Sequence, residues 1–375
     1  MSAARVQKQK EPIIHLSRRT GIPLWKSMCI RAAAILLGFL ICGAVAFFLI
    51  EKLRNNPEKI TLFYSDFING AFGSNRKLWK FLKDVAILLC ISLALTPAFR
   101  MRFWNIGGEG QTLVGVLACI AVTFYLGGRI PEWLLMILML LASLAAGAVW
   151  GLIPAACRAK WGTNETLFTL MMNYVATYLV GFFLEMWVPN GSGALPRQEH
   201  GKMPTIFNDY LLIVLIAVAL TAAMYIYLNY TKHGYEISVV GESVRTARYV
   251  GMNDKKIIIR TIILSGALCG LAGYLIGAGL DRSITADSVG GKGFTAIMVS
   301  WLGKFNPITM VLTSGLIQLL NQGAAQISKD FDVSGALPDV IVGIILFFII
   351  GSEFFINYKI HFRGRGNGAG REAVK

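Results

Sequence analysis

The sequence has few charged residues and almost no histidine. Of its 375 residues, 15% are charged and 55% are hydrophobic, whereas a soluble domain carries about 25% charged residues. A chain of this length needs more charged side chains than this to cover a surface in water. The composition therefore argues against a soluble enzyme, a disordered protein and a secreted disulfide scaffold, and it predicts a protein that crosses a lipid bilayer several times.

Motifs that would hold a nucleotide, a metal or a catalytic nucleophile are also missing. The sequence contains no Gly-x-x-x-x-Gly-Lys-Ser/Thr loop, no His-Glu-x-x-His pair and no Gly-x-Ser-x-Gly turn. Its 4 histidines lie outside the long apolar runs, and its 6 cysteines form no Cys-x-x-Cys pair. We therefore expect neither an enzyme nor a chain that holds a cofactor or metal, and transport or channel activity is the first hypothesis.

Long apolar runs are what the sequence does contain. A helix needs about 20 apolar residues to cross a bilayer, and nine runs reach that length. A further segment, 283–303, begins polar, contains Gly290, Gly291 and Gly293, and turns apolar from Phe294, which predicts a broken or re-entrant helix. We expect an all-α polytopic membrane protein with about ten crossings. The nine runs cover residues 32–50, 81–99, 105–126, 132–157, 165–188, 208–230, 257–280, 306–327 and 337–356.

Basic residues predict the orientation in the membrane. The 36 Lys and Arg against 21 Asp and Glu give a formal charge of +15, and the basic residues separate the apolar runs. Ten crossings with a cytoplasmic N-terminus place the basic excess inside, as the positive-inside rule requires. We expect a cytoplasmic basic tail over 1–31, a transmembrane domain over 32–356, and a second cytoplasmic basic tail over 357–375 that is disordered. This charge pattern is explained by topology and predicts no nucleic-acid partner.

The run that starts at residue 105 opens with polar residues. Asn105, Glu109 and Gln111 stand among three glycines, which would loosen a helix at this point. Carboxylate and amide groups are costly in hydrocarbon, so these side chains face either protein or water. The sequence leaves two interpretations open, a solvated helix start capped by Asn105 or a segment that lines a wet cavity.

A second polar pattern follows at the start of the run 165–188. Glu165, Thr169 and Asn173 are spaced at i, i+4 and i+8, so they lie near one face of a helix. A polar stripe on an otherwise apolar helix either lines a pathway or hydrogen-bonds a neighbouring helix. Both interpretations remain open from the sequence.

Two further stretches predict contacts. Residues 241–253 have the pattern of a short amphipathic helix that ends near Gly251, and it would either rest on lipid headgroups or dock on a cytosolic partner. Within the run 257–280, glycines recur in two Gly-x-x-x-Gly pairs, which predict close packing against neighbouring helices. These glycines are Gly266, Gly270, Gly273 and Gly277.

Four motifs, in order along roughly residues 81–350, together resemble the permease subunit of ABC importers. The resemblance is to the branched-chain amino acid and simple sugar superfamily, and within it to the nucleoside- and purine-type branch. One departure is Trp104, where a less bulky aromatic residue is expected. The motifs are Asn105-Ile106-Gly107-Gly108-Glu109-Gly110-Gln111, Thr163-Asn164-Glu165 with Met171-Met172-Asn173-Tyr174, Gly241-Glu242-Ser243 with Ala247-Arg248-Tyr249-Val250-Gly251-Met252, and Gly293-Phe294-Thr295-Ala296-Ile297 with Leu302-Gly303-Lys304-Phe305-Asn306-Pro307.

The resemblance implies roles for three groups of residues. The substrate path is expected to involve Asn105, Glu109, Gln111, Glu165, Thr169 and Asn173. Coupling to an ATPase is expected to involve Gly241, Glu242, Arg245, Ala247, Arg248, Gly251 and Met252. The re-entrant segment is marked by Gly293, Phe294 and Gly303. The aromatic residues Phe294 and Trp301 would either stack on a base or face lipid.

The resemblance also implies partners and a location. These are an ABC ATPase with two nucleotide-binding domains that holds ATP and Mg, a second permease subunit of the same or a different sequence, and an extracellular substrate-binding protein. The expected place is the plasma (inner) membrane of a bacterium, and the expected cargo is a nucleoside or related purine or pyrimidine compound. Two alternatives stay open, a permease for simple sugars or branched-chain amino acids, and a secondary transporter or channel, which would need no ATPase.

Overall fold

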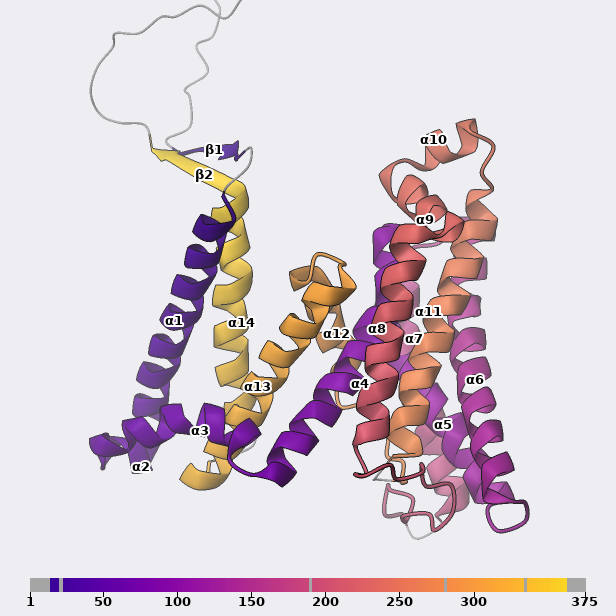
Figure 1. The fold of residues 1–375 in the computed structure, drawn as a ribbon, viewed down its shortest axis with the longest axis horizontal. Helices are drawn as coiled ribbons and strands as arrows, with labels where there is room; N and C mark the ends of the chain where they lie inside the picture. The colour runs from indigo at the N-terminus through magenta and orange to yellow at the C-terminus, as the bar shows by residue number, and fades with distance from the viewer. Residues whose placement is uncertain (1–13, 20–22, 189–190, 280–281, 334–335, 363–375) are drawn as a thin grey trace, which may run out of the picture. The chain divides into compact units, whose positions relative to one another are not determined.

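The computed structural model describes residues 14–19, 23–188, 191–279, 282–333 and 336–362, and these residues are almost entirely helical (Figure 1). The chain divides into two compact units. The larger unit covers residues 67–326, and the smaller unit is formed by the two ends of the chain, residues 1–66 and 327–375. All nine predicted apolar runs coincide with helices, which confirms the predicted all-α class.

The smaller unit is built on two long helices, α1 (Leu24–Leu49) and α14 (Ala336–Asn357), which pack side by side (Figure 1). Arg31 and Glu353 join them by an ion pair of 2.5 Å. At their ends, β1 (Ile14–Arg18) pairs antiparallel with β2 (Tyr358–Phe362). The expectation of disorder after residue 357 was therefore wrong for β2, because a partner strand supplies its backbone hydrogen bonds. Residues 1–13 and 363–375 of the expected tails lie outside the described residues.

Three short elements follow α1 along the chain. They are α2 (Glu51–Arg54), η1 (Pro57–Lys59) and α3 (Ile60–Phe72), which occupies the semi-apolar stretch after the first run. The larger unit then contains α4 (Asn75–Arg100), α5 (Gly108–Leu126), α6 (Glu132–Trp161), α7 (Glu165–Trp187), α8 (Leu211–Tyr230), α9 (Lys232–Glu242), α10 (Val244–Tyr249), α11 (Asp254–Gly277), α12 (Lys292–Leu302) and most of α13 (Pro307–Phe331).

The centre of the larger unit is α11, which packs against α4, α5 and α6. The predicted glycine face makes this possible. A Cβ added at Gly266 would overlap the backbone of Gly147 on α6, and one added at Gly273 would lie 2.6 Å from the Thr112 carbonyl oxygen on α5. The prediction of close helix packing at these glycines is confirmed, and it brings three helix backbones together around the middle of α11.

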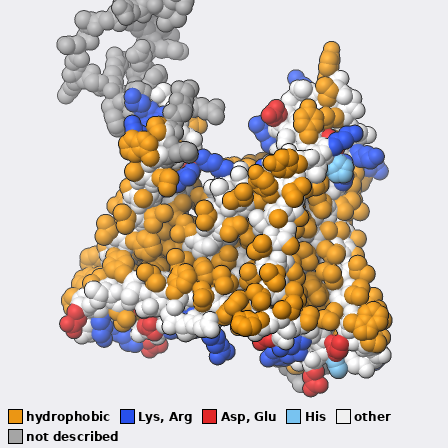
Figure 2. Space-filling model, viewed as in Figure 1, with side chains coloured by type: hydrophobic (Ala, Val, Ile, Leu, Met, Phe, Trp, Pro, Cys, Tyr) orange, Lys and Arg blue, Asp and Glu red, His pale blue; other side chains and the backbone are white. Residues whose placement is uncertain are grey.

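Eight helices of the described residues are long and apolar enough to cross a membrane, namely α1, α4, α5, α6, α7, α8, α11 and α14. The 25-residue α13 is also long enough but more polar. On the face shown in Figure 2, hydrophobic side chains cover the middle of these helices, and charged side chains gather near their ends.

The broken helix expected within 283–303 is present as α12, which has 11 residues. At about 1.5 Å per residue it covers roughly half of a bilayer core of about 30 Å. The residues before it, 282–291, are not helical. The prediction of a broken helix, unwound in its polar first part, is therefore confirmed, and the helical part begins at Lys292.

Candidate translocation and coupling site

The polar motif before α5 is not a helix start capped by Asn105. The chain leaves α4 at Arg100, runs irregularly to Gly107, and enters α5 with Gly107 as the N-cap residue. Asn105 is fully buried. Its side-chain amide donates to Gln111 Oε1 and Ser265 Oγ at 3.3 Å each, and its Oδ1 accepts the Gly107 N–H at 3.0 Å. Asn105 thus supplies hydrogen-bond partners to buried polar groups around the bend at residues 101–107, because buried polar groups need such partners.

Helix α7 holds the same bend from the other side. The Ile106 N–H donates to Thr169 Oγ1 at 3.1 Å, and Asn173 Nδ2 donates to the Ile106 carbonyl at 3.0 Å. Asn173 Oδ1 also accepts the Gly110 N–H at 2.9 Å in the first turn of α5. The polar stripe predicted on this helix therefore makes hydrogen bonds to a neighbouring segment. Because irregular backbone is tolerated at membrane depth only when its polar groups are satisfied, these bonds are what allow the chain to unwind here.

Glu109 joins the first turn of α5 to the start of the short helix α12. Its carboxylate accepts the Gly291 N–H at 2.9 Å and the Gly293 N–H at 2.6 Å, at the start of α12. Gly291 is the N-cap of α12 and has φ of +71°, a left-handed conformation that glycine adopts without strain. The N-termini of α5 and α12 therefore meet at one carboxylate, whose negative charge is favourable beside both positive helix ends.

Glu165 lies apart from this group. It forms an ion pair of 3.3 Å with Arg158, across the junction of α6 and α7. Glu165 also borders a cavity of about 200 Å³ together with Gly241, Glu242 and Ser243. The structure therefore places five of the six predicted path residues around the bend before α5 and its first turn, and it places Glu165 next to the coupling segment. Whether any of the six contacts substrate remains a prediction.

The predicted coupling segment is two helices rather than one. Helix α9 ends at Glu242, and Ser243 separates it from α10. Ser243 is the N-cap of α10, and its Oγ accepts the Thr246 N–H at 3.2 Å. At the other end Gly251 turns the chain with φ of +80°. Arg248 then donates two hydrogen bonds to Asp254, of 3.0 and 2.7 Å, and this contact raises the pKa of the Arg248 guanidinium. The segment is therefore an ordered corner between α9 and α11.

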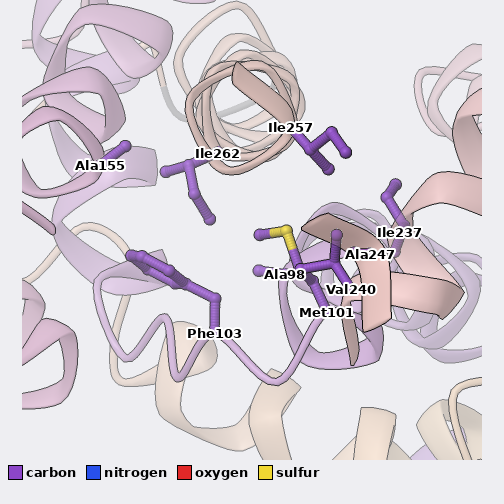
Figure 3. Packing of buried hydrophobic residues seen from close by; sticks show 9 residues of the cluster. All are labelled: Ala98, Met101, Phe103, Ala155, Ile237, Val240, Ala247, Ile257 and Ile262. Carbon is purple, nitrogen blue, oxygen red and sulfur yellow. The ribbon is translucent and has the colours of Figure 1, made fainter. Parts of the chain in front are cut away.

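Buried side chains anchor this corner to the bundle (Figure 3). Ala247 of α10 is fully buried in a cluster that joins adjoining ends of α4, α6, α9 and α11. Tyr249 is 94% exposed, and Val250 beside it is also exposed. In Figure 1, α10 protrudes beyond the other helices of the unit. The remaining cluster members are Ala98, Met101, Phe103, Ala155, Ile237, Val240, Ile257 and Ile262.

Helix α9 also touches the end of α4. A Cβ added at Gly241 would overlap the Arg100 carbonyl oxygen, so the two backbones are in direct contact. The Arg100 guanidinium donates to the carbonyl oxygens of Phe305 and Leu228 at 3.3 Å each. The end of α4 therefore contacts α8, α9 and the residue Phe305 after α12.

The other coupling and re-entrant residues occupy both buried and exposed positions. Glu242, Arg245 and Gly251 are exposed and Met252 is half-buried. Gly293 and Gly303 are buried at the two ends of α12, whereas Phe294 is exposed.

Sequence reasoning did not single out Ser265, which bonds Asn105, or Arg158, which pairs with Glu165. No local pattern marks either residue as a partner of those side chains, because each contact joins residues brought together only by folding.

Known proteins resemble this chain over most of its length. Residues 78–350 match the family described as "Branched-chain amino acid transport system / permease component". The guanosine ABC transporter permease protein NupP of Bacillus subtilis is 30% identical over 298 residues, 77% of this chain and 85% of that protein. The nucleoside ABC transporter permease protein NupB of Lactococcus lactis is 27% identical over 333 residues, 84% of this chain and 88% of that protein.

A relative that is named as a glucose permease matches over a longer stretch of the chain. The glucose ABC transporter permease protein TsgB13 of Haloferax volcanii is 29% identical over 380 residues, 96% of this chain and 97% of that protein. The chain belongs to the family of permease components of branched-chain amino acid transport systems, and it is a multi-pass membrane protein of a transport family.

Proposed function

We propose that this chain is the transmembrane permease subunit of an ATP-driven ABC importer for nucleosides or related purine and pyrimidine compounds. The observation that carries the proposal is the match to the guanosine and nucleoside permeases over more than three quarters of the chain. The protruding corner at α10 supports it, because a permease without its own nucleotide site needs a surface for an ATPase.

The proposed assembly contains this chain and three further components. An ATPase with two nucleotide-binding domains holds ATP and Mg, and this chain holds no cofactor and binds no nucleic acid. A second permease subunit, the same or different, completes the translocation path within the bilayer, and an extracellular binding protein delivers substrate. In this arrangement the chain lies in a bacterial plasma membrane, both termini are cytoplasmic, and α9 and α10 face the cytoplasm.

In the proposed mechanism the corner at α10 receives the movement of the ATPase. Tyr249 and Val250 supply exposed contact surface, whereas Ala247 anchors the corner in the buried cluster. The contact between Gly241 and the Arg100 carbonyl passes the movement to α4. Glu109 keeps the starts of α5 and α12 together, so that these two helices move as one piece beside the path.

Replacing the exposed tip of the corner tests the ATPase contact. We expect Tyr249→Ala to reduce the ATPase that co-purifies with the permease from native membranes at least fivefold, because a large exposed aromatic side chain at the centre of an interface carries much of the binding energy. Tyr178→Ala is the matched control, since Tyr178 is 77% exposed on the side of α7. Equal recovery of ATPase with wild type and Tyr249→Ala would contradict the coupling role.

Simple-sugar import is the second candidate, because the glucose permease matches 96% of this chain. The reconstituted transporter, with its ATPase and binding protein, decides between the two. We expect ATP-dependent accumulation of labelled guanosine or uridine in proteoliposomes and no accumulation of glucose. Uptake of glucose alone would reject nucleoside import, and uptake driven by an ion gradient without ATP would reject the ABC mechanism.

A further inference from the structure

Four aromatic side chains form a closed ring of contacts at the end of α4. Trp104 and Trp301 lie 5.2 Å apart, centroid to centroid, and Trp301 and Phe305 lie 5.9 Å apart. Phe305 stacks on Phe99 at 6.0 Å, and Phe99 meets Trp104 edge-on at 6.1 Å. A cavity of about 350 Å³ lies against this ring, and Arg100 and Arg102 complete its lining. We call these six residues the aromatic cage.

The two tryptophans are not buried by their ring contacts. Trp104 is 43% exposed and Trp301 is 49% exposed, so each keeps a large apolar surface open toward the cavity or its surroundings. A tryptophan that serves only to fill a core would be covered on both faces. Exposed aromatic surface beside a concave space, with a few polar groups, is the usual composition of a small-molecule site.

The backbone around the cage is strained. Arg102, Lys304 and Phe305 have φ values of +58°, +50° and +56°, and none of them is glycine. Such conformations are costly for residues with a Cβ and persist where the surrounding structure enforces them, most often at functional sites. Here they turn the chain on both sides of the cavity, so that residues 99–104 and 301–305 face each other.

The polar network described above fixes both walls of the cage. Trp104 precedes the fully buried Asn105, and Thr169 and Asn173 bind the backbone of the next residue, Ile106. Trp301 lies on α12, whose first turn is held by Glu109. The predicted path residues therefore position the cage. The cage also adjoins the coupling segment, because Arg100 donates to the Phe305 carbonyl and its own carbonyl contacts Gly241.

We propose that the aromatic cage is a subsite for the planar base of the transported nucleoside, at the cytoplasmic end of the path. The inference rests on the proposed function and names the part of the substrate that the site takes. The bases stack on the exposed faces of Trp104 and Trp301, as bases do on aromatic side chains in other proteins. The exposed Arg102 presents a planar fork of donors, which matches the paired acceptors O6 and N7 on the edge of guanine.

Uptake by the complete transporter in proteoliposomes is the first test. Per assembled complex, we expect Trp301→Ala to lower the initial rate of guanosine uptake at subsaturating substrate about tenfold, and Trp301→Phe to restore most of it, because the smaller aromatic ring still stacks. Arg102→Gln should lower guanosine uptake more than cytidine uptake. The matched control is Trp161→Ala, since Trp161 is 66% exposed at the end of α6 and lies outside the cage.

Equal losses in Trp301→Ala and Trp161→Ala would overturn the proposal and assign these tryptophans to anchoring at the lipid interface. An unchanged rate in Trp301→Ala, in a wild type that imports guanosine, would overturn it as well and leave nucleoside import intact.

Photolabelling of the purified complex with 8-azidoguanosine gives a readout that does not depend on transport. We expect the labelled peptides to include residues 99–104 or 301–305, with the label lost in Trp301→Ala and kept in Trp161→Ala. Labelling only elsewhere, or none, would reject the cage as a base site. Labelling of the cage in a transporter that imports no nucleoside would reject the proposed function and keep the binding site.

Discussion

Gly270→Val is expected to destabilise the helix bundle strongly. A Cβ at Gly270 would overlap the Ser143 carbonyl oxygen on α6, and the partner is backbone, which cannot rotate away. Overpacking in a core costs about 1–3 kcal/mol even when side chains can adjust. We therefore expect a loss above that range and a fall in melting temperature of roughly 6–12 °C or more.

The measurement is the yield of monodisperse protein in mild detergent, together with its thermal unfolding. Gly181→Val is the matched control, because Gly181 also lies inside a helix, α7, and a Cβ there would meet nothing within 4 Å. Both variants make the same Gly→Val change inside a helix, with the same change in helix propensity, so the difference between them reports the α6–α11 contact. Equal behaviour of the two variants would show that the backbones of α6 and α11 are not in close contact at Gly270.

Glu109→Ala is expected to have the second-largest effect. It removes the acceptor for the Gly291 and Gly293 N–H groups, and leaving a buried donor unpaired costs about 1–3 kcal/mol for each group. It also removes the negative charge beside the first turn of α12. We expect a destabilisation of about 2–6 kcal/mol and, in the assembled transporter, an uptake rate at least tenfold lower.

Graded substitutions separate this explanation from a general loss of charge. Glu109→Gln keeps one acceptor oxygen and should fall between wild type and Glu109→Ala in both thermal stability and uptake. Glu199→Ala removes an exposed carboxylate from the loop between α7 and α8 and should leave both unchanged. If Glu109→Ala matched Glu199→Ala, the carboxylate would not be what holds α12 at the start of α5.

Several features follow from local pattern, because each depends on the solvent or on spacing along one helix. Apolar runs of about 20 residues can bury themselves only in hydrocarbon, and all nine became helices. The Gly-x-x-x-Gly spacing around Gly266 could be interpreted as a packing face without knowing the partner, since only small residues allow such an approach. The polar start of 283–303 likewise predicted the irregular segment before α12.

The polar residues were harder to interpret, because their partners are distant in the sequence. Asn105 could have been a cap or a lining residue, and the fold made it a link to Gln111 and Ser265. Nothing near Glu109 in the sequence indicates that its acceptors would be filled by Gly291 and Gly293, 182 and 184 residues away. A hydrogen bond needs distances near 3 Å and a defined direction, which the order of residues alone cannot supply.

The composition and the short motifs thus predicted membrane insertion, the positions of the helices and the family. They could do so because hydrophobicity and helical periodicity are properties of contiguous segments. The meeting of the α5 and α12 N-termini, the anchoring of α10 through Ala247, and the ring of Trp104, Trp301, Phe305 and Phe99 were decided by tertiary structure. The physical reason is that each depends on the distance between segments that are far apart along the chain, and this distance is set by how the glycine-lined helices pack against α11.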